Sequence, residues 1–544
     1  MAHAMGRRAH GATSSTAGKP ASAWSPLRQP VFRALWTAGV VSNIGTWMQS
    51  VGGAWFMTSL SRSAVLVALM QTATSLPVLL VGIPAGALAD ILDRRRLLLV
   101  TQTWMLLAAA ALSMLTFWGA ATAWLLLALT FALGLGAALN TPAWQAITPE
   151  IVSRETLTAA VTLSGVSVNI ARAVGPAFGG LVLAAAGPAW VFLLNALSFL
   201  GVIVVVYRWR RLSEPSRLPP EDLVEATRAG WRYVRHSPAL RAVLVRAAVF
   251  VGSAAALWAL MPLVARNQLG LDSTGYGVLY GSLGVGALLG AMVLPAVRRR
   301  LSLDALVGTA TCIFALATLV MGCVPVPAIV GVSMVGAGAA WMALMSSLNV
   351  AALTGAPRWV QARSVAVYMV VFQGVMAGAS VAWGAVAQRL GSPVALALAA
   401  VGLVVGWLAT QRWHLAADGD MDLSPAGYWA EPIVATPPRL DEGPVLVMIE
   451  YRIDPTKSDE FARAMHAVLR GRRRDGAIRA GLWRDPADPA RYVETFVVES
   501  WVGHLRQHER LTVADRAAHQ AARLFHIGEC PPAISHLLAD AHVE

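Results

Sequence analysis

The stretch GALADILDRRRLLL, residues 86 to 99, decides the fold, because it places five charges between two long apolar runs. Asp90, Asp93 and Arg94 to Arg96 lie within seven residues of one another, whereas the flanking sequence is almost free of charge. Over all 544 residues, 56% are hydrophobic, 13% are charged and the mean hydropathy is +0.57. These values exclude an ordinary soluble domain and indicate a membrane protein in which the charged stretch connects two spanning helices.

Apolar runs follow one another from about residue 32 to about residue 413. Each is near the roughly 20 residues that a helix needs to cross the apolar core of a bilayer. About twelve such runs are expected, at 33–58, 64–88, 97–119, 122–146, 157–186, 189–207, 241–266, 274–296, 303–325, 327–351, 363–388 and 392–413. The chain is therefore predicted to be an all-α polytopic membrane protein with twelve transmembrane helices.

The basic residues predict how these helices are oriented, since short cytoplasmic connections carry an excess of Lys and Arg. Arginines precede the first run, follow the second and fourth, fill the middle connection and recur at 298–300, whereas the opposite connections carry only Arg62, Arg266 and Arg389. We expect a multi-pass protein of the cytoplasmic (inner) membrane with both termini in the cytoplasm. This topology accounts for much of the net charge of +13, so nucleic acid is not an expected partner.

The charged stretch also takes part in an internal repeat. A shift of 204 residues places Arg94 to Arg96 over Arg298 to Arg300 and Gly187 over Gly391. Such a repeat is typical of transporters built from two similar halves. The expected organisation is a disordered cytoplasmic tail (1–31), a first six-helix half (32–207), a cytoplasmic linker (208–240), a second six-helix half (241–413), a second linker (414–443) and a soluble α+β cytoplasmic domain (444–544).

Two motifs carry a resemblance to the major facilitator superfamily of transporters. Its signature after the second helix, G-x-L-A-D followed by basic positions around a glycine, is matched by Gly86, Leu88, Ala89, Asp90, Arg94 and Arg95, while Ile91 and Asp93 depart from it. The exporter signature G-P-x-x-G-G is matched by Gly175, Pro176, Gly179 and Gly180. With GLGAALNTPAWQA, these motifs make residues 30 to 413 similar to the branch of enterobactin exporters and macrolide and drug efflux proteins.

The resemblance implies a secondary active exporter of small amphipathic molecules, of siderophore, macrolide or drug type, that works by alternating access in the lipid bilayer. Proton antiport is implied by the resemblance alone, because the spans carry no carboxylate or histidine in their interiors. A lysophospholipid flippase, or an exporter fused to a small monooxygenase-like enzymatic domain, is the alternative. The membrane part is not expected to be an enzyme, and no cofactor or metal is expected.

The gate is expected at the charged stretch. Asp90 is predicted to pair with Arg94, or with a donor on the facing half, when the cytoplasmic gate is shut, and Asp93 is the second candidate for the group that takes up the proton. Topological anchoring is the competing explanation for the arginines. The expected gating and coupling residues are Gly86, Asp90, Asp93, Arg94, Arg95, Arg172, Gly175, Pro176, Gly179 and Gly180.

Arg172 is the one charge deep in the first half, and it should face a cavity or a partner. Neutral polar groups and tryptophans on the gate-forming helices favour an amphipathic, aromatic substrate over a sugar or a small ion. Packing between helices is the competing explanation for each of them. The expected substrate-binding residues are Asn43, Trp47, Gln49, Gln71, Asn140, Trp144, Asn169, Tyr368 and Gln373.

The last 100 or so residues have the composition of a soluble domain, with strand and helix patterns in the order βαββαβ. This order resembles a ferredoxin-like domain of the dimeric α+β barrel type found in antibiotic-biosynthesis monooxygenases. Dimerisation of the chain or regulation of the exporter is the expected use, and a cofactor-free oxygenase is the alternative. His504 and His508 lie four residues apart on one helix face and are expected to be solvated rather than to bind a metal.

Overall fold

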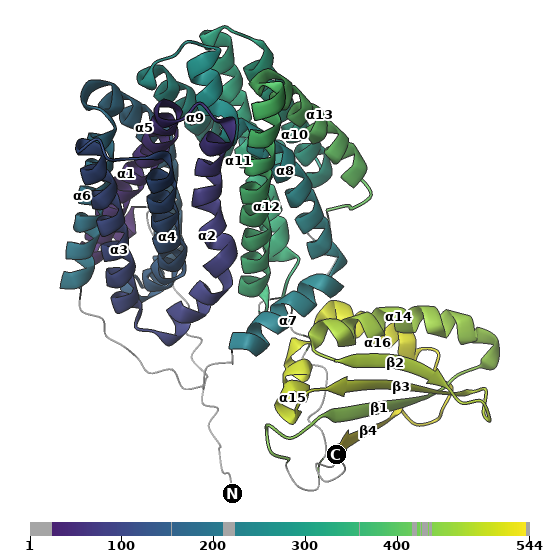
Figure 1. Ribbon diagram of the computed structural model, residues 1–544. Helices are drawn as coiled ribbons and strands as arrows, with labels where there is room; N and C mark the ends of the chain where they lie inside the picture. Colours follow the sequence, from purple (N-terminus) through teal and green to yellow (C-terminus); the bar gives the residue numbers. More distant parts are fainter. Residues whose placement is uncertain are drawn as a thin grey trace, which may run out of the picture.

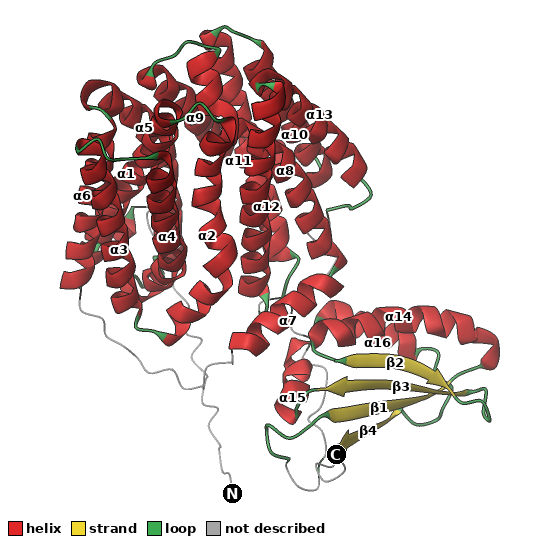
Figure 2. Ribbon diagram, in the orientation of Figure 1, coloured by secondary structure: helices red, strands yellow, loops and turns green. Residues whose placement is uncertain are grey.

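The computed structural model describes residues 24–153, 155–209, 223–357, 359–415, 422–424, 426, 434 and 438–539, and only the backbone of Ala87, Asp90, Ile91, residues 223–229, Ala362 and Glu509. Most of the expected N-terminal tail and parts of both linkers lie outside these residues. A bundle of long helices stands beside a small sheet domain that contains the C-terminal end of the chain (Figure 1). Among the described residues, the strands lie in that small domain (Figure 2).

The first half of the bundle follows a short 3-10 helix at Ser25–Arg28. Its helices are α1 (Pro30–Leu60), α2 (Ala64–Ile91), α3 (Arg94–Phe117), α4 (Ala123–Ile151), α5 (Leu157–Ala186) and α6 (Pro188–Arg208). The second half contains α8 (Pro238–Asn267), α9 (Ser273–Arg298), α10 (Leu303–Cys323), α11 (Pro327–Thr354), α12 (Gln361–Leu390) and α13 (Ser392–Thr410). Several of these helices begin at a Ser, Thr or Asp whose side chain accepts a hydrogen bond from the backbone N–H three residues on, as Ser63, Asp93, Thr122 and Asp272 do.

Eleven helices among the described residues are long and apolar enough to cross a membrane, and they correspond to the second to twelfth expected spans. α1 lies in the place of the first span and packs against α5 and α6, but it is not among the eleven. Polar residues along α1, such as Asn43, Gln49 and Ser50, lower its apolar character. Of the about twelve expected spans, eleven are therefore found among the described residues, and α1 is a more polar helix in the place of the first.

The internal repeat is visible in the helix boundaries. Both bounds of α12 lie 204 residues beyond the bounds of α5. The turns that follow these helices are also alike, because Gly187 and Gly391 have φ angles of +87° and +85°. Only glycine adopts this left-handed conformation without strain, which explains why both halves place a glycine there.

The two ends of the bundle differ in charge. We call the end that carries the connections 92–93, 152–156, 299–302 and 355–360 the basic end, since the arginine runs lie there. The small domain also lies at this end (Figure 1). The other end, with the connections at 61–63, 118–122, 187 and 391, is the opposite end.

The connection between the halves contains a helix that the sequence analysis did not predict, α7 (Leu223–His236). It is amphipathic rather than apolar, and it packs against α12 and α8 of the second half and against α14 of the small domain. Tyr233 and Val234, 1% and 3% exposed, anchor it to the bundle. α7 therefore joins the membrane part to the small domain.

The small domain has the predicted element order. Its elements are β1 (Val445–Arg452), a 3-10 turn at Pro455–Lys457, α14 (Ser458–Asp475), β2 (Arg479–Arg484), β3 (Arg491–Val498), α15 (Trp501–Arg510), α16 (Val513–Arg523) and β4 (Ala533–Leu538). The sheet has the order β2-β3-β1-β4, and its three strand pairs are antiparallel. Alternate residues of β1 and β3, including Val447 and Phe496, point into a core beneath the helices.

The single helix expected near 501–524 is two helices. Leu511 has an extended backbone that ends α15, and Thr512 begins α16 with a reciprocal capping box to Asp515. The break turns α16 so that His519 and Ala522 are buried.

Candidate transport site

Helices α5 and α9 bring the two halves into backbone contact. A Cβ atom placed on Gly180 would lie 2.7 Å from the carbonyl oxygen of Ser273, and one placed on Gly277 would lie 2.7 Å from that of Pro176. Further along, a Cβ on Gly284 would lie 2.5 Å from the carbonyl oxygen of Arg172. Such close approach requires glycine. These contacts occupy the part of α5 from its middle toward the opposite end.

Hydrogen bonds join the halves in the same region. The backbone N–H of Ala64, at the start of α2, donates to Oε1 of Gln388 in α12 over 2.7 Å. The hydroxyl of Thr72 donates to the carbonyl oxygen of Ala377 over 2.8 Å. Arg266 donates to the hydroxyl of Thr58 over 2.9 Å, and its guanidinium lies 5.8 Å from the ring centroid of Trp55. The halves are therefore fastened together at the opposite end.

The predicted gate residues of α5 take part in this fastening. Gly175 and Gly179 face α1, where added Cβ atoms would lie 2.6 Å from Cβ of Trp47 and 2.9 Å from Cα of Met48. Gly180 and the carbonyl group of Pro176 face α9 instead. In this conformation the motif closes the opposite end, and its use at the basic end, which the sequence analysis expected, stays a prediction.

At the basic end, Arg94 is bound to a residue that the sequence analysis did not single out. Its Nη1 lies 2.8 Å from Oε1 of Glu150 and donates to the carbonyl oxygen of Ala146 over 3.1 Å. Both acceptors belong to α4, so the pair fastens the α2–α3 connection to the fourth helix of the same half. Arg298, the repeat equivalent of Arg94, donates to Ser346 and Ser347 of α11 in the corresponding way.

The other residues of the charged stretch have separate places. Asp93 caps α3, because its carboxylate accepts a hydrogen bond from the N–H of Arg96 over 2.9 Å. Arg95 donates to the carbonyl oxygens of Val206 and Tyr207 at the end of α6. Gly86 has no atom within 4 Å of an added Cβ. The side chain of Asp90 lies outside the described residues, so its pairing stays a prediction.

Arg172 lies midway along α5, and its guanidinium lies 5.4 Å from the ring centroid of Trp47 in α1. A charge at this depth costs about 2.5 to 3.5 kcal/mol on insertion scales, and contact with an aromatic face offsets part of that cost. Its Nε atom is buried and has no hydrogen-bond acceptor among the residues that the structure describes. The structure therefore keeps a guanidinium in the bundle with an unused donor.

The ring of Trp47 is the first member of a chain of aromatic contacts that crosses from one half to the other. Trp47 and Tyr280 have ring centroids 6.1 Å apart, Tyr280 and Trp258 have theirs 5.5 Å apart, and Trp258 and Trp341 have theirs 5.3 Å apart. Phe372 of α12 continues the chain 6.0 Å from Trp341. We call these five residues, together with Arg172, the aromatic site.

Two further predicted binding residues lie at or near the aromatic site. Tyr368 stacks at a tilt on Phe372, with centroids 6.3 Å apart, and its hydroxyl lies 3.9 Å from Sδ of Met345. Gln373 follows Phe372 along α12 and is half-buried.

The remaining predicted binding residues hold helices together or bond within one helix. Asn43 donates to Ser167, Gln49 accepts from Asn195, Asn140 accepts from Thr101 and Gln102, Gln71 donates to Ser75, Asn169 donates to the carbonyl oxygen of Gly165, and Trp144 packs at Gly39. Of the predicted set, the structure thus brings together Trp47, Tyr368 and Arg172, with Gln373 beside them. It adds Glu150, Tyr280, Trp258, Trp341 and Phe372, which sequence reasoning missed. The spacing of Tyr276 and Tyr280, four residues apart on one helix, is a signal that could have indicated the aromatic site.

In the small domain, the expectation of solvated histidines is wrong. His504 is completely buried and His519 is 6% exposed. The rings of His508 and His536 lie 4.7 and 4.8 Å from that of His504, centroid to centroid, because β4 places His536 opposite α15. Burial lowers the pKa of His504 to about 3 and that of His508 to about 4, so both are neutral at pH 7. The described residues contain no group of three or more His, Cys, Asp or Glu placed to hold a metal ion.

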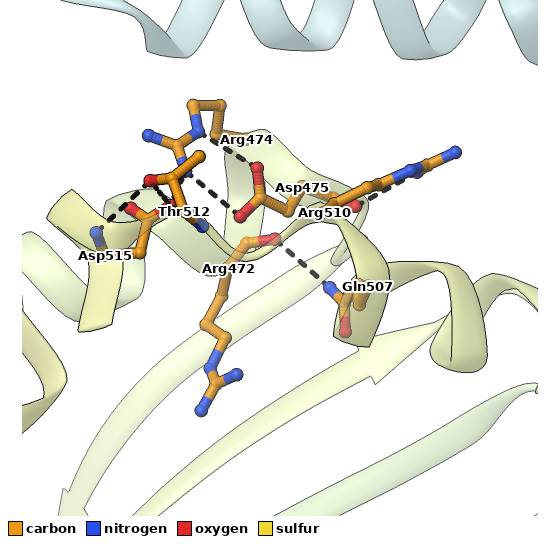
Figure 3. Close-up of polar contacts among 7 residues, drawn as sticks. All are labelled: Arg472, Arg474, Asp475, Gln507, Arg510, Thr512 and Asp515. Atoms are coloured by element: carbon orange, nitrogen blue, oxygen red, sulfur yellow. Dashed lines mark hydrogen bonds and ion pairs between the residues drawn. The ribbon is translucent and has the colours of Figure 1, made fainter. Parts of the chain in front are cut away.

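A polar cluster lies at the end of α14 that faces the bundle (Figure 3). Arg474 lies 3.0 Å from a carboxylate oxygen of Asp475 and also reaches Asp515, the capping residue of α16. Burial raises the pKa of Asp475 to about 6, even though Arg474 lowers it. Arg510 donates to the carbonyl oxygen of Asp475 over 3.2 Å and so fastens α15 to α14.

The same arginines contact the membrane part. The guanidinium of Arg474 lies 5.4 Å from the ring centroid of Tyr233 in α7, and that of Arg510 lies 4.2 Å from the ring centroid of Trp359. Tyr233 and Trp359 contact each other edge to face at 5.7 Å. The small domain is therefore docked on α7 and on the α11–α12 connection through cation–π contacts.

Comparison with known proteins decides the family. Residues 21–543 match a protein family described as transmembrane secretion effector. The chain belongs to the transmembrane secretion effector family. The relatives and the solved structures that this chain resembles are transporters. Together with the family match, they identify the chain as a multi-pass membrane transporter rather than an enzyme.

The curated relatives of this chain are transporters of several compounds. The staphyloferrin A transporter of Staphylococcus aureus is 24% identical over 51% of this chain and 70% of its own length. Macrolide efflux protein A of Streptococcus pyogenes is 22% identical, with 48% of this chain and 65% of its own length covered. The enterobactin exporter of Shigella boydii is 26% identical, with 48% and 62% covered. The chain thus spans less than two thirds of the last two relatives.

Solved structures confirm the fold of this transmembrane secretion effector. A bacterial homologue of the human lysosomal transporter Spinster, inward-facing and unoccupied, has a TM-score of 0.54 at 17% identity and covers 71% of this chain and 95% of its own. A POT family transporter in complex with 5-aminolevulinic acid has a TM-score of 0.57 at 13% identity, with 70% and 94% covered. The helical bundle therefore has the major facilitator fold.

Proposed function

We propose that this protein is a secondary active exporter of small amphipathic molecules and that it works by alternating access. The observation that carries the proposal is the aromatic site, which joins two repeat-related halves whose helices α5 and α9 are in glycine-mediated backbone contact toward the opposite end. The enterobactin exporter and macrolide efflux protein A among the relatives support the export direction.

The arginines support an orientation in which the basic end and both termini face the cytoplasm. With the opposite end fastened, a substrate reaches the aromatic site from the cytoplasm. Arg94 with Glu150, and Arg298 with Ser347, hold helices within each half, so each half moves as a unit. Separation of α5 from α9 then opens the opposite end to the outside.

Proton antiport is the proposed source of energy, with Asp90 as the group that takes up the proton and Asp93 as the second candidate. The helix-capping role of Asp93 favours Asp90, because a protonated Asp93 would lose the acceptor that begins α3. Replacement Asp90→Asn, with membrane levels unchanged, should abolish export driven by a proton gradient.

For the small domain we propose regulation of the exporter through its docking on α7. Dimerisation is the second use, supported by the sheet face that turns away from the helices, where Leu446, Met448 and Val497 leave apolar surface at least partly open. Measuring the mass of the full chain in nanodiscs distinguishes the two, since a dimer through this face doubles the mass.

The experiment that tests the proposed function compares accumulation of a panel of siderophores, macrolides and dyes in cells that lack their own exporters. Cells with the protein should accumulate less of at least one compound, and an uncoupler should abolish the difference. If no compound in the panel is exported, the proposal fails, and lipid flipping becomes the function to assay.

A further inference from the structure

We infer that the transported molecule is an anion with an aromatic or other flat apolar part, and that its negative group binds Arg172 and Trp258. This inference rests on the proposed function and names its substrate class. It separates two chemistries, acidic chelators and cationic drugs, that an exporter of amphipathic molecules could otherwise carry equally well.

The first step is the charge of the bundle. The carboxylates on its helices lie at or near the helix ends, namely Asp90, Glu150 and Asp304. Arg246, in the part of α8 near the basic end, is neutralised because its Nη1 lies 2.5 Å from Asp304. Arg172 lies midway along α5, far from these carboxylates in sequence and in depth. The middle of the bundle is therefore positive.

The second step is the set of unused donors. Nε of Arg172 and Nε1 of Trp258 are both buried, and neither has a hydrogen-bond acceptor in the described part of the chain. Both side chains belong to the aromatic site, joined through Trp47 and Tyr280. Buried donors without acceptors are costly, and a ligand that accepts hydrogen bonds would remove that cost. A carboxylate or a phenolate can accept hydrogen bonds from such donors, whereas an ammonium group has no acceptor to offer them.

The third step is the surrounding surface. The faces of Trp47, Tyr280 and Trp258 meet at angles of 59° and 60°, so they form walls rather than a stack. Aromatic walls bind flat apolar groups well, and Arg172 already lies over one of them. A substrate with an aromatic ring next to its negative group would contact the walls and the donors together.

The test is equilibrium binding of radiolabelled salicylate, an aromatic carboxylate, to the purified full-length protein in nanodiscs. Salicylamide has almost the same shape without the charge, and ethidium is an aromatic cation. Salicylate should bind at least about tenfold more tightly than salicylamide, which is the usual effect of a hydrogen bond to a charged group, and ethidium should not compete.

Variants of the protein test whether Arg172 causes the preference for salicylate over salicylamide. Arg172→Gln should lose the preference for salicylate over salicylamide, and Arg172→Lys should keep part of it. Arg62→Gln is the matched control, because it removes the same charge from an exposed position at the opposite end. The comparison of the two ligands on the unaltered protein stands even if Arg172→Gln fails to fold.

The inference is overturned if salicylamide or ethidium binds as tightly as salicylate, if the folded protein binds no salicylate, or if folded Arg172→Gln keeps the preference. Because binding is measured without transport, failure of this inference can be distinguished from failure of the proposed export function. A protein that binds salicylate selectively but exports nothing would contradict export and leave the anion site standing.

Discussion

Nη1 of Arg94 lies 2.8 Å from Oε1 of Glu150, and this pair joins the charged α2–α3 connection to α4 rather than to the facing half. The side chains are 26% and 23% exposed, so the pair is partly shielded from water. An arginine that holds two helices of one half together at the basic end keeps that half rigid while the two halves move relative to each other. The charged stretch is therefore structural and mechanical as well as topological.

Replacement Glu150→Gln should weaken this fastening by about 1 kcal/mol, the usual worth of a partly exposed ion pair, and reduce export several-fold at unchanged membrane levels. Glu155→Gln, an exposed carboxylate in the connection that follows α4, is the matched control. The double variant Arg94→Gln/Glu150→Gln should be no worse than the worse single variant. Additive losses in the double variant would show that the two residues act separately.

Replacement Gly180→Val should force α5 and α9 apart, because the Cβ atom of the new side chain would lie 2.7 Å from the carbonyl oxygen of Ser273. We expect export to fall by about tenfold or more, since the opposite end no longer closes. Gly201→Val on α6, where an added Cβ meets nothing within 4 Å, should leave export unchanged. Size-exclusion profiles of both variants check that they fold. Equal export by the two variants would rule out this closure.

Replacement Arg510→Ala removes the cation over Trp359 and should loosen the small domain from the bundle. A partly exposed cation–π contact is worth about 1 kcal/mol, so amide exchange at the edge of α7 and at 355–361 should become several times faster. Hydrogen exchange with mass spectrometry on the full chain measures this. Arg484→Ala, on the exposed edge strand β2, is the control and should change neither segment.

Acid should destabilise the small domain. His504 and His508 have a pKa near 6.5 when unfolded but about 3 and 4 when folded, so the unfolded chain binds more protons and stability falls as pH drops below about 6.5. Asp475 opposes this, because its pKa rises to about 6 on folding and it gains a proton in the folded state below that pH. For these three groups together the loss from pH 7 to pH 5 is about 2 kcal/mol, and His519, whose pKa is also lowered by burial, adds to it.

Amide exchange of β1 and β3 in the full chain, corrected for the intrinsic effect of pH, measures this loss. His504→Phe should remove part of the pH dependence, because it replaces a titrating ring with an apolar one of similar shape. His466→Phe, at an exposed position on α14, should not. A pH dependence that is identical in the two variants would contradict the role given to the buried histidines.

The sequence predicts the membrane fold well because long apolar runs need no tertiary information. The 204-residue repeat is also visible in the sequence. Arg94 and Gly187, like their equivalents Arg298 and Gly391, have roles set by their place at a helix end or in a turn, which needs no tertiary information. The βαββαβ order of the small domain follows equally from strand alternation and helix periodicity. α7 was missed because an amphipathic helix of 14 residues in an arginine-rich connection has the composition of a linker.

The candidate site is less accessible to sequence reasoning, because its contacts join residues far apart in the chain. Glu150 lies 56 residues from Arg94, and Trp258, Trp341 and Phe372 come from three helices of the second half. The histidines were assigned to solvent because helix spacing shows which residues share a face but not what covers that face. The burial of His504 depends on β4, whose pairing with β1 no local pattern reveals.

The central claim, proton-driven secondary export, is tested most directly by transport into proteoliposomes with an imposed pH gradient. With the lumen more acidic than the outside, radiolabelled salicylate should enter vesicles that contain the protein, because protons leave as the substrate enters. Nigericin, which collapses the gradient, should abolish this entry. Entry that is the same with and without the gradient, or no different from protein-free vesicles, would contradict the account.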